Sequence, residues 1–339
     1  MSLNNKKKII IPTESYPGEK RVLVLPPSVK VLVDEGNEVF VQSNAGKGIE
    51  ITDGEYEKAG AKIIHETIDL YANAEDGLIV KLKAPSPEEF SFMNNSLLFC
   101  MLHIDQNKER IYYLGKHNLI GLAMEEIRDL RGKRLVDQTH ITGEIGVYYA
   151  MRHFKKMPED MKAVILGYGN VGTGAITACS KLGINYKIMR REELSRLNMW
   201  LKDADLLINA ICWPEEQRIN QEYLVTREDI VNSKSNLIIL DLSVDFPNPI
   251  ETIKPTDYVN TFYIEEDRVH ISIYGYPGLV PITSSKLYDF QILPIIKKIT
   301  SNFKQNDELE KAIEKAVINP SNYEWDKFKP ESTEVSKLE

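Results

Sequence analysis

The chain has 339 residues, a length that predicts two domains, each able to bury a core of its own. Hydrophobic residues make up 42% of it and charged residues 27%, a composition that argues against a disordered or fibrous protein. A formal net charge of −8 opposes attraction to nucleic acid or to an anionic membrane, so we expect small molecules as partners. No apolar run approaches the roughly 20 residues of a membrane span, and the run at residues 9–13 is too short for a signal-peptide core. The expected location is the cytoplasm.

The three cysteines are widely spaced, and each lies among apolar neighbours. This spacing fits neither a disulfide framework nor a zinc site. We therefore expect Cys100, Cys179 and Cys212 to be reduced packing residues, and we expect no metal site.

Short apolar runs alternate with amphipathic stretches from residue 9 to about residue 124. The expected strands are Lys8–Ile11, Glu38–Val41, Ala61–Ile64, Gly77–Val80, Leu97–Phe99 and Leu119–Ala123. The expected helices between them include Pro26–Gly36, Asp53–Gly60 and Asn107–Gly115. Strands of this length separated by helices predict βαβ units and a mainly parallel sheet.

A linker helix is expected next, at residues 139–156. Its apolar residues Ile141, Ile145, Tyr148 and Tyr149 follow helical spacing and form one stripe. Because that stripe is apolar, we expect self-association into a homo-oligomer.

A second series of apolar runs begins near Lys162 and ends near Ile273. Its expected strands are Ala163–Leu166, Tyr186–Met189, Asp205–Ile208 and Asn236–Leu240, and the amphipathic segment Thr283–Phe303 follows the series. The expected fold is α/β with two doubly wound domains. A Rossmann dinucleotide-binding domain (residues 139–278) is inserted into a discontinuous, flavodoxin-like catalytic domain (residues 1–138 and 279–329), and a tail follows (residues 330–339).

The most specific motif is G-x-G-x-x-G, formed by Gly167, Gly169 and Gly172. It comes directly after an expected strand and opens an expected helix, which is the context of a dinucleotide site. Gly167 permits the tight turn, Gly169 lets the backbone approach a pyrophosphate, and Gly172 allows close packing of helix on strand. With Asn170 and Val171, these glycines offer backbone N–H groups at a helix N-terminus to the anion.

The residues after the second strand of this domain select between NAD and NADP. An acidic residue there normally accepts hydrogen bonds from the ribose 2′-hydroxyl, but this chain has Arg190 and Arg191. A pair of guanidinium groups suits the 2′-phosphate of NADP. We therefore expect NADP as the cofactor, with NAD as the alternative if these are only solvated loop arginines.

Titratable side chains stand at the ends of three expected strands in the first domain. Lys81 and Lys83 lie two apart and should share one face and one ligand-facing mouth, which would lower the pKa of a lysine. His103 ends the next strand, and Arg21, after the first strand, is a natural clamp for a carboxylate. Carboxyl ends of parallel strands are where ligands gather.

Several segments resemble, in order and spacing, the alanine dehydrogenase, pyridine-nucleotide transhydrogenase and saccharopine dehydrogenase superfamily over nearly the whole chain. They are Ile11-Pro-Thr-Glu, Arg21-Val, Gly36-Asn-Glu-Val-Phe-Val-Gln, Ala45-Gly-Lys-Gly, Ile51-Thr-Asp, Ala59-Gly-Ala, Lys81-Leu-Lys-Ala-Pro and Leu102-His103. The resemblance implies that Arg21 binds the substrate carboxylate, that Lys83 bonds the carbonyl or imine, and that His103 is the acid/base. It also implies that Asp245 lies beside the nicotinamide.

The resemblance leaves the family member open. The Lys81–Pro85 motif is most similar to alanine dehydrogenases, which are longer and carry an acid where Arg190 stands. The Tyr16–Arg21 stretch and the Asp245–Glu251 segment are more similar to carboxyethylornithine synthase, and saccharopine dehydrogenases share parts of both patterns.

We therefore expect an NAD(P)H-dependent oxidoreductase acting on CH–NH bonds, which reduces the imine of a 2-oxo acid such as pyruvate and an amino-acid amine. The carboxyethylornithine-type reaction ranks first, alanine dehydrogenase (pyruvate plus ammonia) second and saccharopine dehydrogenase third. A non-catalytic dinucleotide sensor is the rival class. An amino-acid amine needs charged groups beyond Arg21. The candidates for these groups are Glu19, Lys20, Glu125 and Glu126.

Overall fold

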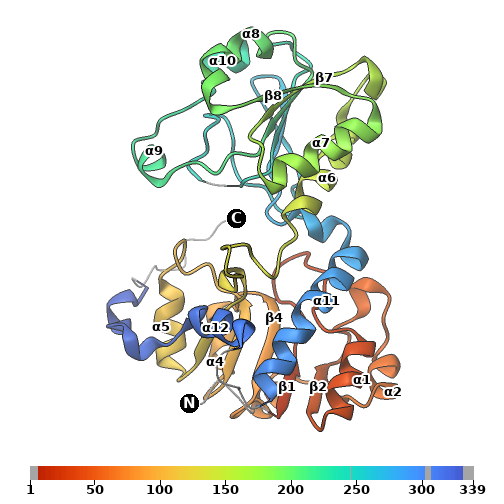
Figure 1. Cartoon of the computed structure of the whole chain (residues 1–339), viewed down its shortest axis with the longest axis vertical. Helices are drawn as coiled ribbons and strands as arrows, with labels where there is room; N and C mark the ends of the chain where they lie inside the picture. Colours follow the sequence, from red (N-terminus) through yellow and green to blue (C-terminus); the bar gives the residue numbers. More distant parts are fainter. Residues whose placement is uncertain (1–6, 245, 302–306, 331–339) are drawn as a thin grey trace. The chain divides into compact units, whose positions relative to one another are not determined.

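The computed structural model describes residues 7–244, 246–301 and 307–330 of the chain. The chain divides into two compact units, one formed by Met1–Asp137 with Pro281–Glu339 and the other by Gln138–Val280 (Figure 1). Each unit is built on a sheet of its own.

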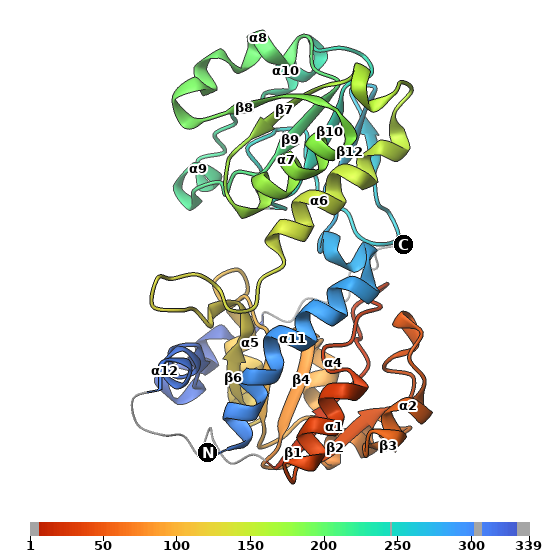
Figure 2. The same ribbon diagram turned by 45° about the vertical axis from the view of Figure 1, so that its right-hand side comes forward.

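The sheet of the first unit has the order β13-β6-β5-β4-β1-β2-β3 (Figure 2). Its strands are β1 (Lys8–Ile11), β2 (Glu38–Gln42), β3 (Lys62–Ile64), β4 (Leu78–Lys83), β5 (Leu97–Met101), β6 (Ile120–Ala123) and β13 (Val317–Ile318). β1 to β6 are parallel, and β13 pairs antiparallel with β6. The inner strands β1, β4 and β5 are nearly continuous apolar runs because helices cover both of their faces.

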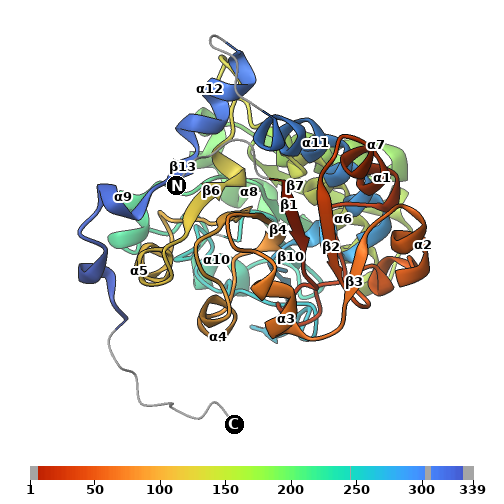
Figure 3. The same ribbon diagram turned by 90° about the horizontal axis from the view of Figure 1, so that it is seen from below.

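Two layers of helices cover this sheet (Figure 3). One face carries α1 (Pro26–Asp34), α2 (Asp53–Lys58), α11 (Pro281–Thr300) and α12 (Glu308–Lys315), and the other carries α3 (Thr67–Ala72), α4 (Pro87–Ser91) and α5 (Glu109–Lys116). A separate apolar core fills the space under each layer. The long helix α11 returns from the second unit, so the first unit is built from both ends of the chain.

The sheet of the second unit has the order β11-β12-β10-β9-β7-β8. Its strands are β7 (Lys162–Leu166), β8 (Asn185–Met189), β9 (Leu206–Asn209), β10 (Ile238–Asp241), β11 (Tyr263–Glu265) and β12 (Arg268–Ile271). All pair in parallel except β11, which runs antiparallel to β12. Apolar cores lie under the pair α6 (Thr139–Ala150) and α7 (Asn170–Leu182) and, separately, under α8 (Leu197–Leu201) and α10 (Arg227–Val231).

The predicted α/β class with two doubly wound units is confirmed, and the strand orders add a detail. In the first unit the strands run 3-2-1-4-5-6 in chain order, and the five parallel strands of the second run 2-1-3-4-5. The flavodoxin-like order thus belongs to the glycine-loop unit, and the first unit has the other doubly wound order, because its chain adds β2 and β3 on one side of β1 before it crosses to β4. In both orders the chain first adds strands on one side of its first strand and then crosses over and adds strands on the other side, so the sheet reverses its direction of growth at this switch point. Doubly wound sheets bind ligands at the carboxyl ends of the strands there.

The linker helix differs from the prediction. α6 ends at Ala150, and its fully buried residues are Gly143, Gly146, Val147 and Ala150, whereas the expected stripe of Ile141, Ile145, Tyr148 and Tyr149 is only half-buried. The reason is a close crossing with α7. A Cβ atom on Gly143 would lie 1.9 Å from the carbonyl oxygen of Val171, and one on Gly174 would lie 2.0 Å from that of His140. The small residues therefore form the contact face.

Candidate active site

The first candidate site lies at the carboxyl ends of β1, β4, β5 and β6, where the sheet of the first unit reverses its direction of growth. The segment after β1 carries Glu14 and Tyr16, β4 ends at Lys83, and His103 follows β5. These residues lie far apart in the chain, and the parallel sheet brings them to one edge.

Arg21 is buried and fixed by its neighbours. Its Nε donates to Glu19 Oε1 at 2.7 Å, its Nη2 donates to Glu19 Oε2 at 2.5 Å, and its Nη1 lies 3.3 Å from the hydroxyl of Ser284. The side chain of Glu19 is itself fully buried, and the arginine lowers the pKa of this carboxyl. Glu19 therefore orients Arg21 through two parallel bonds.

Lys83 is the residue with the most unusual basicity in this group. Burial, followed by the positive charge of Arg21, lowers the pKa of its ammonium group to about 8. Its Nζ lies 5.1 Å from the centre of the Tyr16 ring. The strand end that carries it is held by Glu14, whose carboxylate accepts the backbone N–H groups of Leu82 at 2.5 Å and Lys83 at 3.1 Å. The site thus contains an amine that can change its protonation state near neutral pH.

Lys81 does not share this position, contrary to the prediction of a common mouth. Its side chain is buried, and its Nζ donates to both carboxylate oxygens of Glu89, at 2.6 and 2.5 Å. Glu89 also accepts from the hydroxyl groups of Tyr71 and Ser15, each at 2.6 Å. Pairing within the core explains the outcome, because an unpaired ammonium group would be costly there. The neighbouring positive charge that lowers the pKa of Lys83 is that of Arg21.

His103 follows β5 in a left-handed backbone conformation with φ 41°. Glu125, buried in the turn after β6, accepts the backbone N–H groups of His103 at 2.5 Å and Leu102 at 3.1 Å. Its Oε1 lies 3.9 Å from Nδ1 of the imidazole. Burial and the nearby cations Arg110, Lys83 and Arg134 lower the pKa of His103 to about 4, so the ring is neutral at neutral pH. Glu125 thus supports the histidine from within the protein.

Sequence reasoning missed the supporting residues. Glu14 belongs to the resembling segment Ile11-Pro-Thr-Glu, but that segment gives no sign that its carboxylate binds the end of β4. Arg110 carries no motif, and its role depends on a tertiary contact, the hydrogen bond that it donates to the carbonyl oxygen of Leu102. Among the predicted extra charged groups, Lys20 is exposed, and Glu126 pairs with Arg128 at 3.2 Å.

The second candidate site lies in the other unit, at the carboxyl ends of β7, β8 and β9. A cavity of about 490 Å³ is lined there by residues that follow these strands, among them Gly167, Arg190, Arg191 and Cys212. The sheet reverses its direction of growth between β7 and β9, so this is the expected ligand position of a doubly wound sheet.

The glycine loop has the geometry that its motif requires. Gly167 has φ 95°, and a Cβ there would lie 2.8 Å from the carbonyl oxygen of Ala210. A Cβ on Gly172 would lie 2.5 Å from the carbonyl oxygen of Gly167, whereas one on Gly169 would point into open space. Asn170 and Val171 open α7, so the helix N-terminus follows the loop. These residues fit a bound pyrophosphate.

Arg190 and Arg191 are both exposed where β8 ends. Asp245, the residue expected beside the nicotinamide, lies outside the described residues, as does most of the tail predicted at residues 330–339.

Two further observations bear on the predicted site classes. Cys100 and Cys179 are buried as expected, but Cys212 is exposed, because it lies in the loop after β9 rather than in the core. Within the described ranges, no group of three or more His, Cys, Asp or Glu side chains is placed to hold a metal ion. No helix in the described part of the chain has the length and apolar character of a membrane span.

Comparison with known proteins decides the family. Residues 10–139 match the N-terminal domain of the alanine dehydrogenase/PNT family, and residues 188–322 match its C-terminal domain. An alanine dehydrogenase of Staphylococcus epidermidis is 30% identical over 315 residues, which cover 82% of this chain and 83% of that protein. The chain belongs to the alanine dehydrogenase/PNT family. The predicted oxidoreductase class and a dinucleotide cofactor are thereby confirmed.

Other relatives agree with this assignment. Alanine dehydrogenase 2 of Staphylococcus aureus is 26% identical over 344 residues, covering 89% of this chain and 91% of that protein. A solved L-alanine dehydrogenase has a TM-score of 0.79 at 26% identity, covering 91% of this chain and 94% of its own. A transhydrogenase from Sinorhizobium meliloti, at 22% identity and a TM-score of 0.76, covers 90% and 96% and shares the fold.

Proposed function

We propose that the protein is an NAD(P)H-dependent amino-acid dehydrogenase that reduces the imine formed from a 2-oxo acid and an amine. The simplest version is the reaction named by its relatives, in which the oxo acid is pyruvate, the amine is ammonia and the product is alanine. The observation that carries the proposal is that Lys83 and His103 stand at the carboxyl ends of the neighbouring parallel strands β4 and β5. The pKa values of both side chains are lowered there, to about 8 for Lys83 and about 4 for His103.

The residues divide the work of catalysis among them. Arg21, oriented by Glu19, binds the carboxylate of the oxo acid, and Lys83 donates a hydrogen bond to the carbonyl oxygen or the imine. His103 moves the proton that enters or leaves during water loss and reduction. A dinucleotide bound at Gly167, Gly169, Asn170, Val171 and Gly172 supplies the hydride, and Asp245 is assigned to the nicotinamide end by resemblance alone.

The test is the oxidation of NADPH and NADH with pyruvate and ammonia. Lys83→Met and His103→Ala are each expected to lower kcat/KM by about 10²–10⁴-fold, the usual contribution of a positioned acid or base. Turnover at the wild-type level in both variants would overturn the assignment. Cofactor binding without oxidation, for any oxo acid and amine, would favour the non-catalytic sensor.

Cofactor choice is proposed to depend on Arg190 and Arg191, which line the cavity after β8 where an acid would select NAD. Each guanidinium can make charge-assisted bonds with a 2′-phosphate. We expect NADPH to bind more tightly than NADH in a titration of nicotinamide fluorescence. The double variant Arg190→Ala/Arg191→Ala should weaken NADPH binding by tenfold or more and leave NADH binding nearly unchanged. Equal affinities in the wild type would make these arginines surface charges only.

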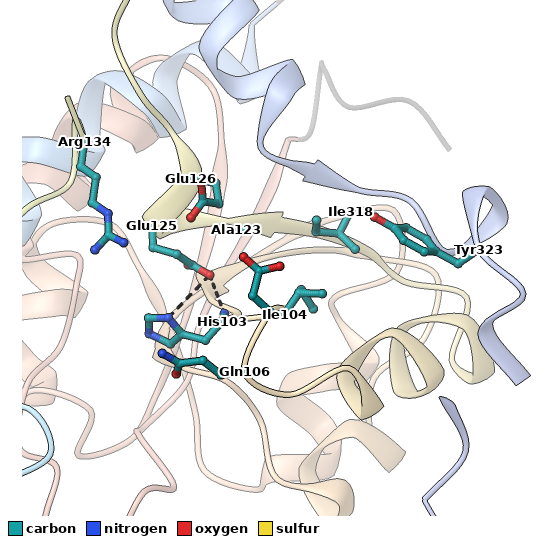
Figure 4. A pocket seen from close by; sticks show the side chains of 10 residues that line it. His103, Ile104, Gln106, Ala123, Glu125, Glu126, Arg134, Ile318 and Tyr323 are labelled. Carbon is teal, nitrogen blue, oxygen red and sulfur yellow. Dashed lines mark hydrogen bonds and ion pairs between the residues drawn. The ribbon is translucent and has the colours of Figure 1, made fainter. Parts of the chain in front are cut away.

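The carboxyethylornithine-type reaction remains the second candidate. It needs a binding place near His103 for an amino acid, which carries both an ammonium and a carboxylate group. A cavity beside that histidine is lined by side chains of both charges, Arg134 and the acids Asp105, Glu125 and Glu126 (Figure 4).

A further inference from the structure

A tight turn, Tyr16 to Glu19, lies between the end of β1 and Arg21. The N–H of Glu19 donates to the carbonyl oxygen of Tyr16 at 3.0 Å, and Gly18 has φ 77°. Pro17 in the second position and a glycine with positive φ in the third are typical of a type II turn. Because proline fixes its own φ and glycine accepts the left-handed one, the turn holds Tyr16 and Glu19 in a defined relation to each other.

The two ends of this turn contact two groups of the candidate active site. At one end Glu19 orients Arg21 through two parallel bonds. At the other end the ring centre of Tyr16 lies 5.1 Å from Nζ of Lys83. A cation within about 6 Å of a ring centre makes a cation–π contact. One short segment thus joins the proposed carboxylate clamp to the proposed donor to the carbonyl oxygen.

The residues before Tyr16 hold its half-buried side chain in place. The hydroxyl of Ser15 donates to Glu89 in α4 at 2.6 Å, and the carboxylate of Glu14 binds the backbone at the end of β4. The backbone is therefore fixed on both sides of Tyr16. A ring on a fixed backbone loses little further conformational entropy when it contacts Lys83, so the contact costs little to maintain.

Titratable side chains from several elements act on the ammonium group of Lys83. They are Arg21, Glu19 and Glu14 after β1, Arg110 in α5 and His103 after β5. Burial and the two arginines lower the pKa of Lys83, and the two carboxylates raise it. The π face of an aromatic ring also favours the ammonium form, because it carries partial negative charge. Unlike a carboxylate, a ring face cannot take up the proton of the amine.

We propose that Tyr16 is a positioning residue for Lys83, whose ring face holds Nζ in place and stabilises its ammonium form for hydrogen bonding to the carbonyl oxygen or the imine. This inference rests on the proposed function, because it concerns the work of Lys83 in that reaction. Tyr16 acts through Lys83 and transfers no proton itself. The proposal therefore requires an aromatic ring at this position and does not require the phenol hydroxyl.

The first experiment measures the protonation of Lys83 without turnover. Acetic anhydride reacts only with the neutral amine, so the pH dependence of Lys83 acetylation, followed by mass spectrometry of the peptide that carries it, gives the pKa of this lysine. Tyr16→Leu removes the ring face and should lower this pKa by about half a pH unit or more, the usual size of a cation–π contact. Tyr16→Phe keeps the ring and should leave it unchanged. Equal values in the wild type and Tyr16→Leu would overturn the proposal.

The second experiment follows kcat/KM with pH, using the oxo acid, amine and cofactor that the wild type accepts. Tyr16→Leu should lower kcat/KM by about tenfold, because a displaced amine no longer meets the carbonyl oxygen in the required geometry. The limb of the profile that reports Lys83 should move to lower pH in the same variant. Tyr16→Phe should restore both, and Tyr16→Trp should bind the ammonium group at least as well as the wild type. A loss in Tyr16→Phe as large as that in Tyr16→Leu would contradict the role of the ring.

A matched control and the acetylation data separate this inference from the proposed function. Phe92→Leu removes an exposed aromatic ring at the end of α4 and should change neither the pKa of Lys83 nor kcat/KM. Turnover in the wild type with an unchanged pKa of Lys83 in Tyr16→Leu would overturn the role of Tyr16 alone. Absence of turnover in the wild type with every oxo acid and amine would overturn the proposed function, whatever the acetylation shows.

Discussion

Lys83 and His103 are in different protonation states at neutral pH. The lysine, with a pKa of about 8, is still mostly an ammonium group that can donate a hydrogen bond, whereas His103, with a pKa of about 4, is a neutral imidazole. Three nearby cations contribute to that low value. We expect the proposed 2-oxo acid to bring a negative charge among these cations when it binds, which would raise the pKa of His103 and let it carry a proton during turnover.

The lowered pKa of Lys83 predicts a stability cost. Between pH 8 and 10.5 the folded protein binds fewer protons at this residue than the unfolded chain does, so the free energy of unfolding rises with pH over that window. Below pH 8 the free energy of unfolding is lowered by the full cost of keeping the buried lysine charged. Lys83→Met removes the cost. At pH 7 the variant should be more stable than the wild type by about 1–3 kcal/mol, and the difference should shrink by pH 10. Urea unfolding of both proteins at pH 7 and pH 10 measures this difference. Equal stability of the wild type and Lys83→Met at pH 7 would contradict the prediction.

Other residues could be assigned from the sequence only in part. Gly167 and Gly172 were predictable because a turn and a close approach leave no other residue type for these positions. The pairing of Lys81 with Glu89 was not, since the two-residue spacing from Lys83 gives no sign of a partner in α4.

At the scale of elements, the turn after β10 depends on one buried carboxylate. Asp241 accepts from the amide of Asn209 at 2.8 Å and from the hydroxyl of Ser272 at 2.6 Å, which joins the ends of β9, β10 and β12. It also accepts the backbone N–H groups of Ser243 at 3.3 Å and Val244 at 3.2 Å. Ser243 in turn donates to the carbonyl oxygen of Ile211, on the wall of the cavity at the carboxyl ends of β7, β8 and β9.

Asp241→Asn keeps the shape of this side chain but replaces an acceptor with a donor. We expect a loss of about 1–3 kcal/mol in the free energy of unfolding, because buried donors then lack acceptors, together with weaker dinucleotide binding. Asp267→Asn, at an exposed carboxylate of the same unit, is the control and should leave both nearly unchanged. Chemical denaturation and a fluorescence titration measure the two effects. An Asp241→Asn protein with wild-type stability would contradict the role of this carboxylate.

The elements were more predictable than their contacts. β1 to β10 follow the apolar runs of the sequence because buried parallel strands are continuous apolar segments. The short edge strands β11 and β13 have no such signal, since Tyr263–Glu265 and Val317–Ile318 are only partly buried. The contact face of α6 was mispredicted, because apolar spacing selects large side chains and the close crossing with α7 selects glycine.

At the scale of the whole molecule, each unit has its own sheet, and the strand order of each sheet has a switch point of the kind at which doubly wound sheets bind ligands. The first unit carries the ionisable groups, Arg21, Lys83 and His103, and the second carries the glycine loop and the arginines after β8. Family membership assigns both to one oxidoreductase. The central claim is that hydride passes from the nicotinamide to the carbon of an imine built from an oxo acid.

That transfer can be followed directly. The protein is supplied with NADPH or NADH carrying deuterium at C4 of the nicotinamide, together with pyruvate and either ammonia, ornithine or lysine, and the product is analysed by mass spectrometry. The account predicts an amine product with one deuterium on the carbon that was the carbonyl carbon of pyruvate, formed in equal amount to the oxidised cofactor. Consumption of the cofactor without deuterium at that carbon, or no amine product with any of the three amines, would contradict it.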